Sequence, residues 1–205
     1  MSRLDWGSEF RNYIRGLDRG VIYFPDQEAV VWDGLVSVQE TPALEVTPTY
    51  FEGITRSLQQ DISDYEAVVE SYVFPYILED AIFVFQDART LGGSLVEDRP
   101  FNMSYRTMTA DGYEIHLVYN VVATIDSLDH TTLSDDSDLT PFSFTLYGTA
   151  VDIPNARHSS HLILRTSEIA EELIPLVEDV LYGSDRFQPT FPTPEELIAI
   201  LGSGS

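Results

Sequence analysis

The chain contains four histidines, the side chains that most readily hold a metal ion or act as a general base near neutral pH. His158 and His161 are three residues apart, and on a helix they would share one face as metal ligands do. His161, however, opens a predicted strand, where this spacing places the two imidazoles on opposite faces. His116 falls on the polar side of another predicted strand, beside Glu114, and we expect a hydrogen-bonded surface or interface residue there. We therefore predict no metal site and no catalytic histidine.

Other chemical motifs are absent or incomplete. Residues 134–138 (SDDSD) are similar to an acidic calcium loop but lack the central glycine and closing glutamate of the EF-hand pattern, so we expect a solvated loop. The absence of lysine excludes a phosphate-binding loop, and the absence of cysteine excludes disulfides, thiolate zinc sites and a cysteine nucleophile. No Gly-x-Ser-x-Gly elbow is present. We predict a protein that is not an enzyme and uses no cofactor.

The charge of the chain is strongly one-sided. It carries 34 acidic side chains against 11 basic ones, all arginine, for a formal net charge of -23. Such a surface repels polyanions, and the arginines form no cluster that would bind a nucleic acid. Two explanations stay open: a GC-rich or salt-adapted genome that favours these residues, or a surface past which a polyanion slides without binding.

Length and hydropathy indicate one soluble domain with arms. A chain of 205 residues with 43% hydrophobic content can bury a substantial core. No apolar stretch approaches the roughly 18 residues of a membrane-spanning helix, and the polar start is unlike a signal peptide. We expect an N-terminal arm over residues 1–18, a β domain with a flanking helix over 19–183, and a C-terminal linker and short helix over 184–205.

Residues 20–167 show predominantly strand patterns. The clearest strand, 113–123, has alternating apolar residues that are predicted to share one face: Tyr113, Ile115, Leu117, Tyr119, Val121 and Ala123. Asp111 and Gly112 predict a hairpin between this strand and the strand 101–109. Further strands are expected at residues 21–24, 29–32, 35–40, 54–62, 65–74, 142–147 and 161–165. These short strands predict a mainly β (α+β) fold, either a β-sandwich or a partly closed barrel with a flanking helix.

Three segments have helical features. Residues 76–85 are apolar enough for a buried helix or a further strand, and the pattern does not decide between them. Residues 168–182 carry one apolar helical face, with Ser167 as the expected N-cap and Gly183 as the expected end, and Pro175 either kinks this helix or begins it. The sequence TPEE at 193–196 combines a cap, a proline at the first helical position and a glutamate three residues after the cap, which predicts a final short helix.

Seven short segments occur in an order and spacing similar to those of a known family. They are 17–23 (LDRGVIY), 32–38 (WDGLVSV), 50–53 (YFEG), 104–107 (SYRT), 112–120 (GYEIHLVYN), 181–183 (LYG) and 192–197 (PTPEEL). In this order they resemble the major tail (tail tube) proteins of long-tailed phages, or siphoviruses, that infect actinobacteria. The likeness covers nearly the whole chain, although none of the segments is catalytic.

The resemblance implies a structural protein of the phage virion, assembled in the host cytoplasm. Such a protein self-assembles into stacked rings, expected to be hexameric, that form a hollow tube for DNA ejection. An acidic lumen would let DNA pass without binding, which agrees with the charge argument, and Glu66, Glu70 and Glu114 are the expected lumen-facing acids. The implied partners are other copies of the chain and, at the tube ends, terminator, tape measure and distal tail proteins, with no membrane.

Assembly would also give a role to the apolar residues near both ends. Expected inter-subunit contacts are Trp6, Phe10, Tyr13, Phe191, Leu197, Ile198 and Leu201. Alternatively, these residues cover the core of their own subunit. Two other functions stay open: a head-tail connector, tail terminator or minor tail protein, and a ligand- or metal-binding β-sandwich module that uses the aromatic residues and acidic loops.

Overall fold

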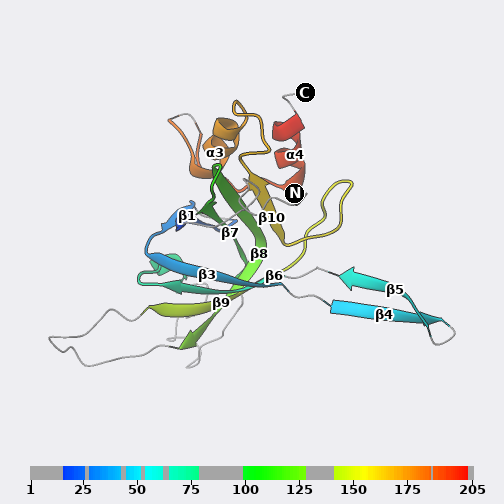
Figure 1. Ribbon diagram of the computed structural model, residues 1–205. Helices are drawn as coiled ribbons and strands as arrows, with labels where there is room; N and C mark the ends of the chain where they lie inside the picture. The colour runs from blue at the N-terminus through cyan, green and yellow to red at the C-terminus, as the bar shows by residue number, and fades with distance from the viewer. Residues whose placement is uncertain are drawn as a thin grey trace, which may run out of the picture.

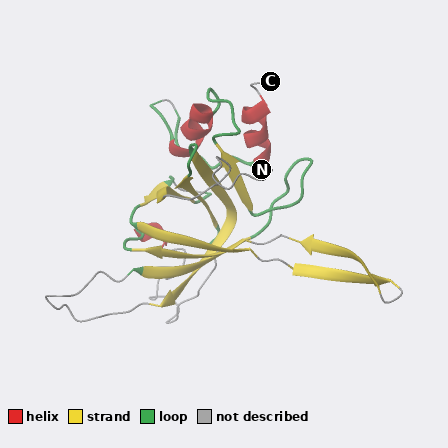
Figure 2. Ribbon diagram, viewed as in Figure 1, coloured by secondary structure: helices red, strands yellow, loops and turns green. Residues whose placement is uncertain are grey.

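The computed structural model describes residues 16–25, 28–42, 45–51, 54–61, 65–78, 99–127, 141–185 and 187–202. Within these ranges the protein is mainly β: one large antiparallel sheet that does not close, a separate two-stranded sheet, and two helices on one side (Figures 1 and 2). The predicted mainly β fold with a flanking helix is therefore confirmed. None of the helices in the described ranges has the length and apolar content that a bilayer crossing requires.

The main sheet is formed by eight strands in the order β2-β1-β7-β8-β9-β6-β3, and β10 also pairs with β8. The strands are β1 Gly16–Tyr23, β2 Val30–Trp32, β3 Leu35–Pro42, β4 Glu45–Phe51, β5 Ile54–Asp61, β6 Tyr65–Ser71, β7 Phe101–Met108, β8 Tyr113–Ser127, β9 Phe142–Gly148 and β10 His161–Arg165. Each predicted strand is present, with ends shifted by up to a few residues, whereas β4 was not predicted. The predicted hairpin joins β7 to β8, where the Thr109 N–H donates to the Gly112 carbonyl at 3.0 Å.

The sheet curls, so that strands from its opposite ends share one interior. Trp32 at the β2 edge contacts Phe144 of β9 edge-on, with ring centroids 5.6 Å apart, although three strands separate β2 from β9. The Trp32 indole N–H also donates to Ser71 Oγ and to the Val73 carbonyl, both at 3.1 Å. The interior, which we call the inner core, is lined by buried residues that include Ile22, Phe24, Val69, Phe101, Met103, Val118, Val121 and Leu146.

A second core, the outer core, lies on the opposite side of the sheet under the helices α3 Ile174–Tyr182 and α4 Pro194–Gly202 (Figure 1). It contains Ile115, Leu117 and Tyr119 of β8 together with Val21, Tyr23, Leu164, Val177, Leu181 and Leu197. The sheet is therefore apolar on both faces where the helices cover it. Burial against the sheet is what stabilises two helices that are each too short to persist alone.

The predicted alternation of β8 is wrong beyond Tyr119. Ile115 and Leu117 face the outer core as expected, but Val121 and Ala123 face the inner core. The reason is a β-bulge: three steps of β8, from Val118 to Val121, match two steps of β7, and Asn120 adopts φ 47°. One extra residue moves every later side chain to the other face of the strand.

The helices decide between two alternatives and confirm two predictions. Helix α3 begins at Ile174 with Pro175 in its first turn, so the proline begins the helix, as one alternative had it, and Ser167 is not its N-cap. It ends at Gly183, as predicted, with φ 76°. The predicted cap of α4 is also confirmed, because Thr193 Oγ1 accepts from the Glu196 N–H at 3.3 Å and Glu196 Oε2 accepts from the Thr193 N–H at 2.9 Å. Of the undecided segment 76–85, residues 76–78 are helical and the rest lies outside the described residues.

Strands β4 and β5 form a ribbon that projects from the body of the molecule (Figure 1). They pair with each other, and neither belongs to the main sheet. At the base of this β4–β5 ribbon Pro42 of β3 is directly opposite Tyr65 of β6, so the strands that enter and leave the ribbon are already neighbours. The ribbon is thus an extension of the β3–β6 pair beyond the core.

Candidate functional site

The inner core is polar at one end, where side chains from six positions contact one another. We call this cluster the inner network; it consists of Glu40, Tyr65, Tyr105, Thr107, His116 and His161. Strand β8 supplies His116, which is 4% exposed, and β10 supplies His161, whose side chain is 15% exposed. Glu40 comes from β3 at the edge of the sheet, and the curl of the sheet brings it to the two histidines.

The two imidazoles and the carboxylate are within a few ångströms of one another. His116 Nδ1 lies 3.0 Å from His161 Nε2 and 3.4 Å from Glu40 Oε1. His161 Nδ1 lies 3.7 Å from Glu40 Oε2. On its other side the His116 ring contacts Thr107, with Nε2 at 2.9 Å from Oγ1. Both ring nitrogens of His116 are therefore engaged.

Two tyrosines surround this group and fix its geometry. The Tyr105 hydroxyl donates to Glu40 Oε1, and the Tyr65 and Tyr105 hydroxyl oxygens are 3.2 Å apart. The Tyr105 ring stacks on His116 with centroids 4.4 Å apart and an interplanar angle of 10°, while Tyr65 meets His161 edge-on at 4.9 Å. The histidine rings thus have little freedom to turn.

Burial sets the protonation states of the inner network. Desolvation, with a smaller effect from His161 and Arg165, lowers the pKa of His116 to about 3. Desolvation also lowers the pKa of His161, and it raises the pKa of Tyr65 and of Tyr105. At neutral pH both imidazoles are therefore uncharged and both phenols are protonated. The group can share hydrogen bonds or hold a cation through nitrogen and oxygen lone pairs.

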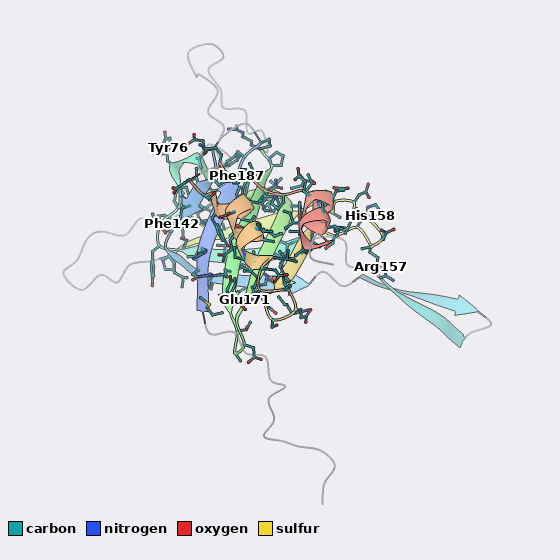
Figure 3. All side chains as sticks on the ribbon, turned by 90° about the horizontal axis from the view of Figure 1, so that it is seen from above. Tyr76, Phe142, Arg157, His158, Glu171 and Phe187 are labelled. Atoms are coloured by element: carbon teal, nitrogen blue, oxygen red, sulfur yellow. The ribbon has the colours of Figure 1, made fainter. Side chains whose placement is uncertain are left out.

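The predictions for the histidines need correction. His116 is buried rather than at a surface or interface, and His161 lies beside it. His158, by contrast, has a 72% exposed side chain that contacts Asp152 at 2.7 Å, at the periphery of the molecule (Figure 3). His158 and His161 are not neighbours, as expected, whereas the pair His116 and His161 was not foreseen. It arises from the antiparallel pairing of β8 with β10, in which His116 is opposite Ile163 and Val118 is opposite His161.

A second polar cluster, the outer network, lies at the edge of the outer core. It consists of Asp18, Arg19, Arg106, Tyr113 and Glu178. Arg106 binds Asp18 through two hydrogen bonds of 2.7 Å, and its guanidinium lies 4.6 Å from the centre of the Tyr113 ring. Glu178 of α3 accepts from Tyr113 at 2.9 Å and from Arg19 at 3.3 Å. This cluster fastens α3 to β1, β7 and β8.

The predicted lumen-facing acids do not lie on one face of the sheet. Glu66 and Glu70 are four residues apart on the same side of β6, opposite to the side that faces the inner core, and both are half-buried. Ser37 Oγ donates to Glu70 at 3.0 Å. Glu114 lies on the other side of the sheet, next to the inner network, and accepts from Arg165 Nε at 3.0 Å. A surface lined by Glu66 and Glu70 would therefore not include Glu114.

The predicted contact residues are divided between the core and the surface. Trp6, Phe10 and Tyr13 lie outside the described residues, as do His130 and the acidic loop 134–138. Leu197 is 3% exposed in the outer core, against which Phe191 and Leu201 also pack, so these residues cover the core of their own subunit. Ile198 is 45% exposed. Whether any of them also meets another subunit stays a prediction.

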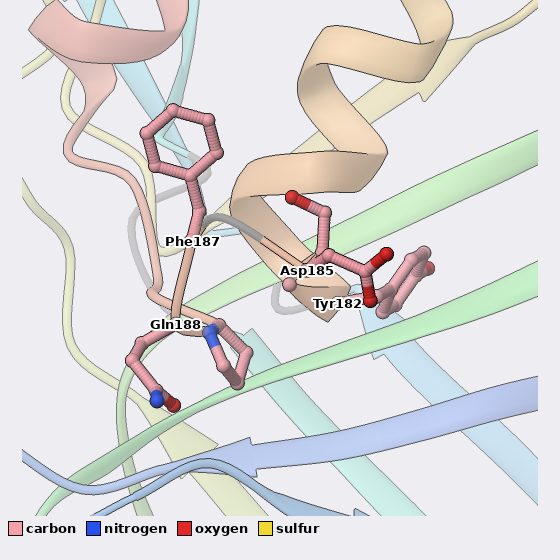
Figure 4. A pocket seen from close by; sticks show the side chains of 7 residues that line it. Tyr182, Asp185, Phe187 and Gln188 are labelled. Atoms are coloured by element: carbon pink, nitrogen blue, oxygen red, sulfur yellow. The ribbon is translucent and has the colours of Figure 1, made fainter.

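Two surface hollows lie beside the helices. One, of about 420 Å³, follows the end of α3, with Phe187 and Gln188 on one side and Tyr182 and Asp185 on the other (Figure 4). The second, of about 460 Å³, lies between α3 and α4 and is mainly apolar, lined by Leu176, Asp179, Val180, Phe187, Ala199 and Ile200. Leu176 is 48% exposed and Phe187 is 63% exposed, so this apolar groove is open to solvent.

The chain has few detectable similarities to known proteins. No protein-family model matches the chain, and no curated protein matches it. Among solved structures, the chain is similar to one from the "Cryo-EM structure of the anti-feeding prophage (AFP) baseplate, 6-fold symmetrised", with 14% sequence identity over 71% of this chain and 92% of that chain. The TM-score is 0.33, and a likeness at this level establishes neither a common fold nor a common role.

Proposed function

We propose that this chain is a structural protein of a phage tail: a tail tube subunit that self-assembles into stacked, six-membered rings around an acidic channel. The resemblance of seven ordered segments to tail tube proteins motivates the proposal. One structural observation carries it: the β4–β5 ribbon, which extends from the body without a partner in the main sheet.

Within one chain, strands β4 and β5 of the ribbon pair only with each other, so the main sheet does not stabilise them. A two-stranded hairpin is marginally stable in water, and each of its strands has an edge of backbone groups available for pairing. A neighbouring copy in a ring can complete such a ribbon by packing against it or by extending a sheet. We therefore assign the ribbon to the contact between adjacent subunits.

The charge distribution supports a channel that does not bind DNA. Glu66 and Glu70 lie on the side of β6 away from the inner core. Within the sheet β6 pairs with β3 and β9, and the outer core under the helices contains no described residue of β6. If this face lines the channel, its carboxylates place part of the net charge of -23 along the channel and repel phosphate. DNA would then slide through the channel without a tight contact.

Removing the ribbon tests the proposal. Replacement of residues 44–62 by a short Gly-Ser turn can join β3 directly to β6, because Pro42 and Tyr65 are already paired. The unaltered chain is expected to form rings or tubes in electron micrographs and in sedimentation, whereas the shortened chain is expected to remain monomeric with an unchanged unfolding temperature. Tyr76→Ser, which alters a 78% exposed aromatic residue elsewhere on the surface, is the control and should still assemble.

The outcome also separates related roles. A full-length chain that stays monomeric at every salt and protein concentration would contradict the proposal. Assembly that stops at a single ring would indicate a head-tail connector or tail terminator instead of a tube subunit. Assembly that persists without the ribbon would leave the tail function possible but would remove the observation on which we base it.

A further inference from the structure

Glu40, His116 and His161 present three ligand atoms to one point at the polar end of the inner core, where Glu40 is exposed, His116 is buried and His161 is half-buried. The ligand atoms of this trio all lie within 4.8 Å of one another, and the separations that involve His116 Nδ1 are 3.0 and 3.4 Å. In a tetrahedral zinc site with bonds of about 2.0 Å, neighbouring ligand atoms are about 3.3 Å apart. We propose that this trio binds a single zinc ion, which links β3, β8 and β10.

The surroundings of the trio suit metal ligation. A histidine that binds a metal through one nitrogen donates from the other to a fixed acceptor, and Thr107 Oγ1 lies 2.9 Å from His116 Nε2. His116 can therefore carry its hydrogen on Nε2 and offer the Nδ1 lone pair. The Tyr105 hydroxyl donates to Glu40 and orients the carboxylate in the same way.

Metal binding would replace one hydrogen bond. His116 Nδ1 and His161 Nε2 are 3.0 Å apart, so with the hydrogen of His116 on Nε2 and without metal the His161 Nε2–H would donate to His116 Nδ1. With zinc, both of these nitrogens turn their lone pairs to the ion, and the His161 hydrogen moves to Nδ1, which lies 3.7 Å from Glu40 Oε2. The net change is a shift of tautomer at His161, and the protein as a whole gains or loses no proton.

The donor set determines which ion fits. Two imidazole nitrogens and one carboxylate oxygen suit zinc, whereas calcium and magnesium prefer sites made of oxygen ligands. Glu40 is the carboxylate of the trio, and its described partners are Tyr105, His116 and His161. The nearby Arg165 pairs instead with Glu114 and Glu168. The inner network thus contains an anionic carboxylate that no arginine among the described residues neutralises.

The ion would have a structural role, linking strands of the sheet, rather than a catalytic one. Strand β3 is at one end of the sheet, and β9 and β6 separate it from β8. A bond from Glu40 to an ion held by His116 and His161 would cross the interior and hold the curl of the sheet. Because the ion binds the folded chain, a hundredfold excess over the dissociation constant is expected to raise the unfolding temperature by about 5 to 10 °C.

Calorimetric titration of the chelator-treated full chain with zinc chloride tests the proposal. We expect one zinc ion per chain, with affinity lowered at least about 100-fold in His161→Gln and in Glu40→Gln. Glu40→Gln keeps a group that can accept from Tyr105, so it decides the question if circular dichroism shows that His161→Gln does not fold. His158→Gln is the matched control, since His158 also lies beside a carboxylate, at 2.7 Å from Asp152, but on the surface.

Three results of the zinc titrations would overturn the inference. They are the absence of zinc binding by the unaltered chain, equal binding by Glu40→Gln, and a loss of binding in His158→Gln as large as that in His161→Gln. Calcium chloride is the probe for ion type, and binding as tight as that of zinc would contradict the assignment. The inference is independent of the proposed tail function, because a chain that assembles into tubes without binding zinc overturns the metal site alone.

Discussion

The two polar networks of this protein bridge strands in similar ways but balance charge differently. In the outer network Arg106 and Arg19 meet Asp18 and Glu178, so fixed positive charges neutralise fixed negative ones at a partly solvated edge. In the inner network Glu40, whose side chain is 33% exposed, meets the neutral imidazoles of His116 and His161 and the phenol of Tyr105. The outer network is complete with the side chains of one chain, whereas the inner network would be completed by a cation.

This difference predicts how the two faces of the sheet respond to change. Stability on the outer face depends on helix packing, on the arginine bonds and on pH, and should not respond to metal. Stability on the inner face should respond to metal. Changes on the outer face are therefore expected to lower the free energy of unfolding while they leave zinc affinity unaltered.

The largest effect is expected from Leu181→Ala in the outer core. Leu181 is fully buried at the end of α3, and removal of a buried leucine side chain typically costs 2 to 5 kcal/mol, so we expect a loss of about 3 kcal/mol in urea unfolding. Leu176→Ala, on the exposed side of the same helix, is the control and should cost far less. A loss below about 1 kcal/mol at Leu181 would show that α3 is not part of the cooperative core.

An intermediate effect is expected from Arg106→Met. The change removes the double hydrogen bond to Asp18 and leaves Glu178 with weaker compensation. Because Asp18 is 40% exposed, the cost should fall below that of breaking a fully buried ion pair, and we expect about 2 kcal/mol. Arg165→Met, which affects a 46% exposed arginine, is the control with an expected cost of at most about 1 kcal/mol.

The same variant has a predicted pH signature. The hydrogen bond from Arg106 lowers the pKa of Asp18 below its usual 3.8, against the opposing effect of burial and with help from the charges of Arg106 and Arg19. The other titratable groups that face this site are Arg19 of β1, Tyr113 of β8, and Glu178 and Tyr182 of α3. Since the folded pKa is depressed, the contribution is present above pH 3.8 and is lost as the pH falls through the folded pKa. Urea unfolding between pH 5 and pH 2 should show this loss in the unaltered chain and less of it in Arg106→Met.

The smallest effect is expected from Thr193→Ala at the start of α4. Loss of the Thr193 hydroxyl leaves the Glu196 N–H without its cap, and such changes cost about 1 kcal/mol. Thr190→Ala, at an exposed position three residues earlier, should cost little. Equal losses in the two variants would mean that the cap contributes nothing beyond the general effect of a threonine substitution.

Features that depend on neighbouring residues could be predicted from the sequence. The cap of α4 joins Thr193 to Glu196, and the turn at Gly112 joins two consecutive strands, so both signals lie within a few positions. The end of α3 at Gly183 is equally local. The start of α3 stayed undecided because an apolar stripe continues upstream of Pro175, whereas the proline favours the first helical turn, where the structure has it.

Features that depend on strand pairing could not be predicted. The bulge at Asn120 is defined only by the pairing of β8 with β7. The inner network includes residues of β3, β8 and β10, and the order of these strands in the sheet does not follow from their order along the chain. Strand β4 was missed for a related reason. It contains Pro48, which is unfavourable inside a sheet but acceptable in a ribbon where each strand has one neighbour.

Trp32 lies where the two ends of the curled sheet meet and provides an intrinsic fluorescence probe. The chain has two tryptophans, and Trp32 is 1% exposed, with its indole N–H bonded to Ser71 and Val73 and its ring against Phe144. A chain carrying Trp6→Phe would therefore emit from this one buried indole, at short wavelengths when folded. Its fluorescence would report whether the two ends of the curled sheet stay together while other parts of the molecule are altered.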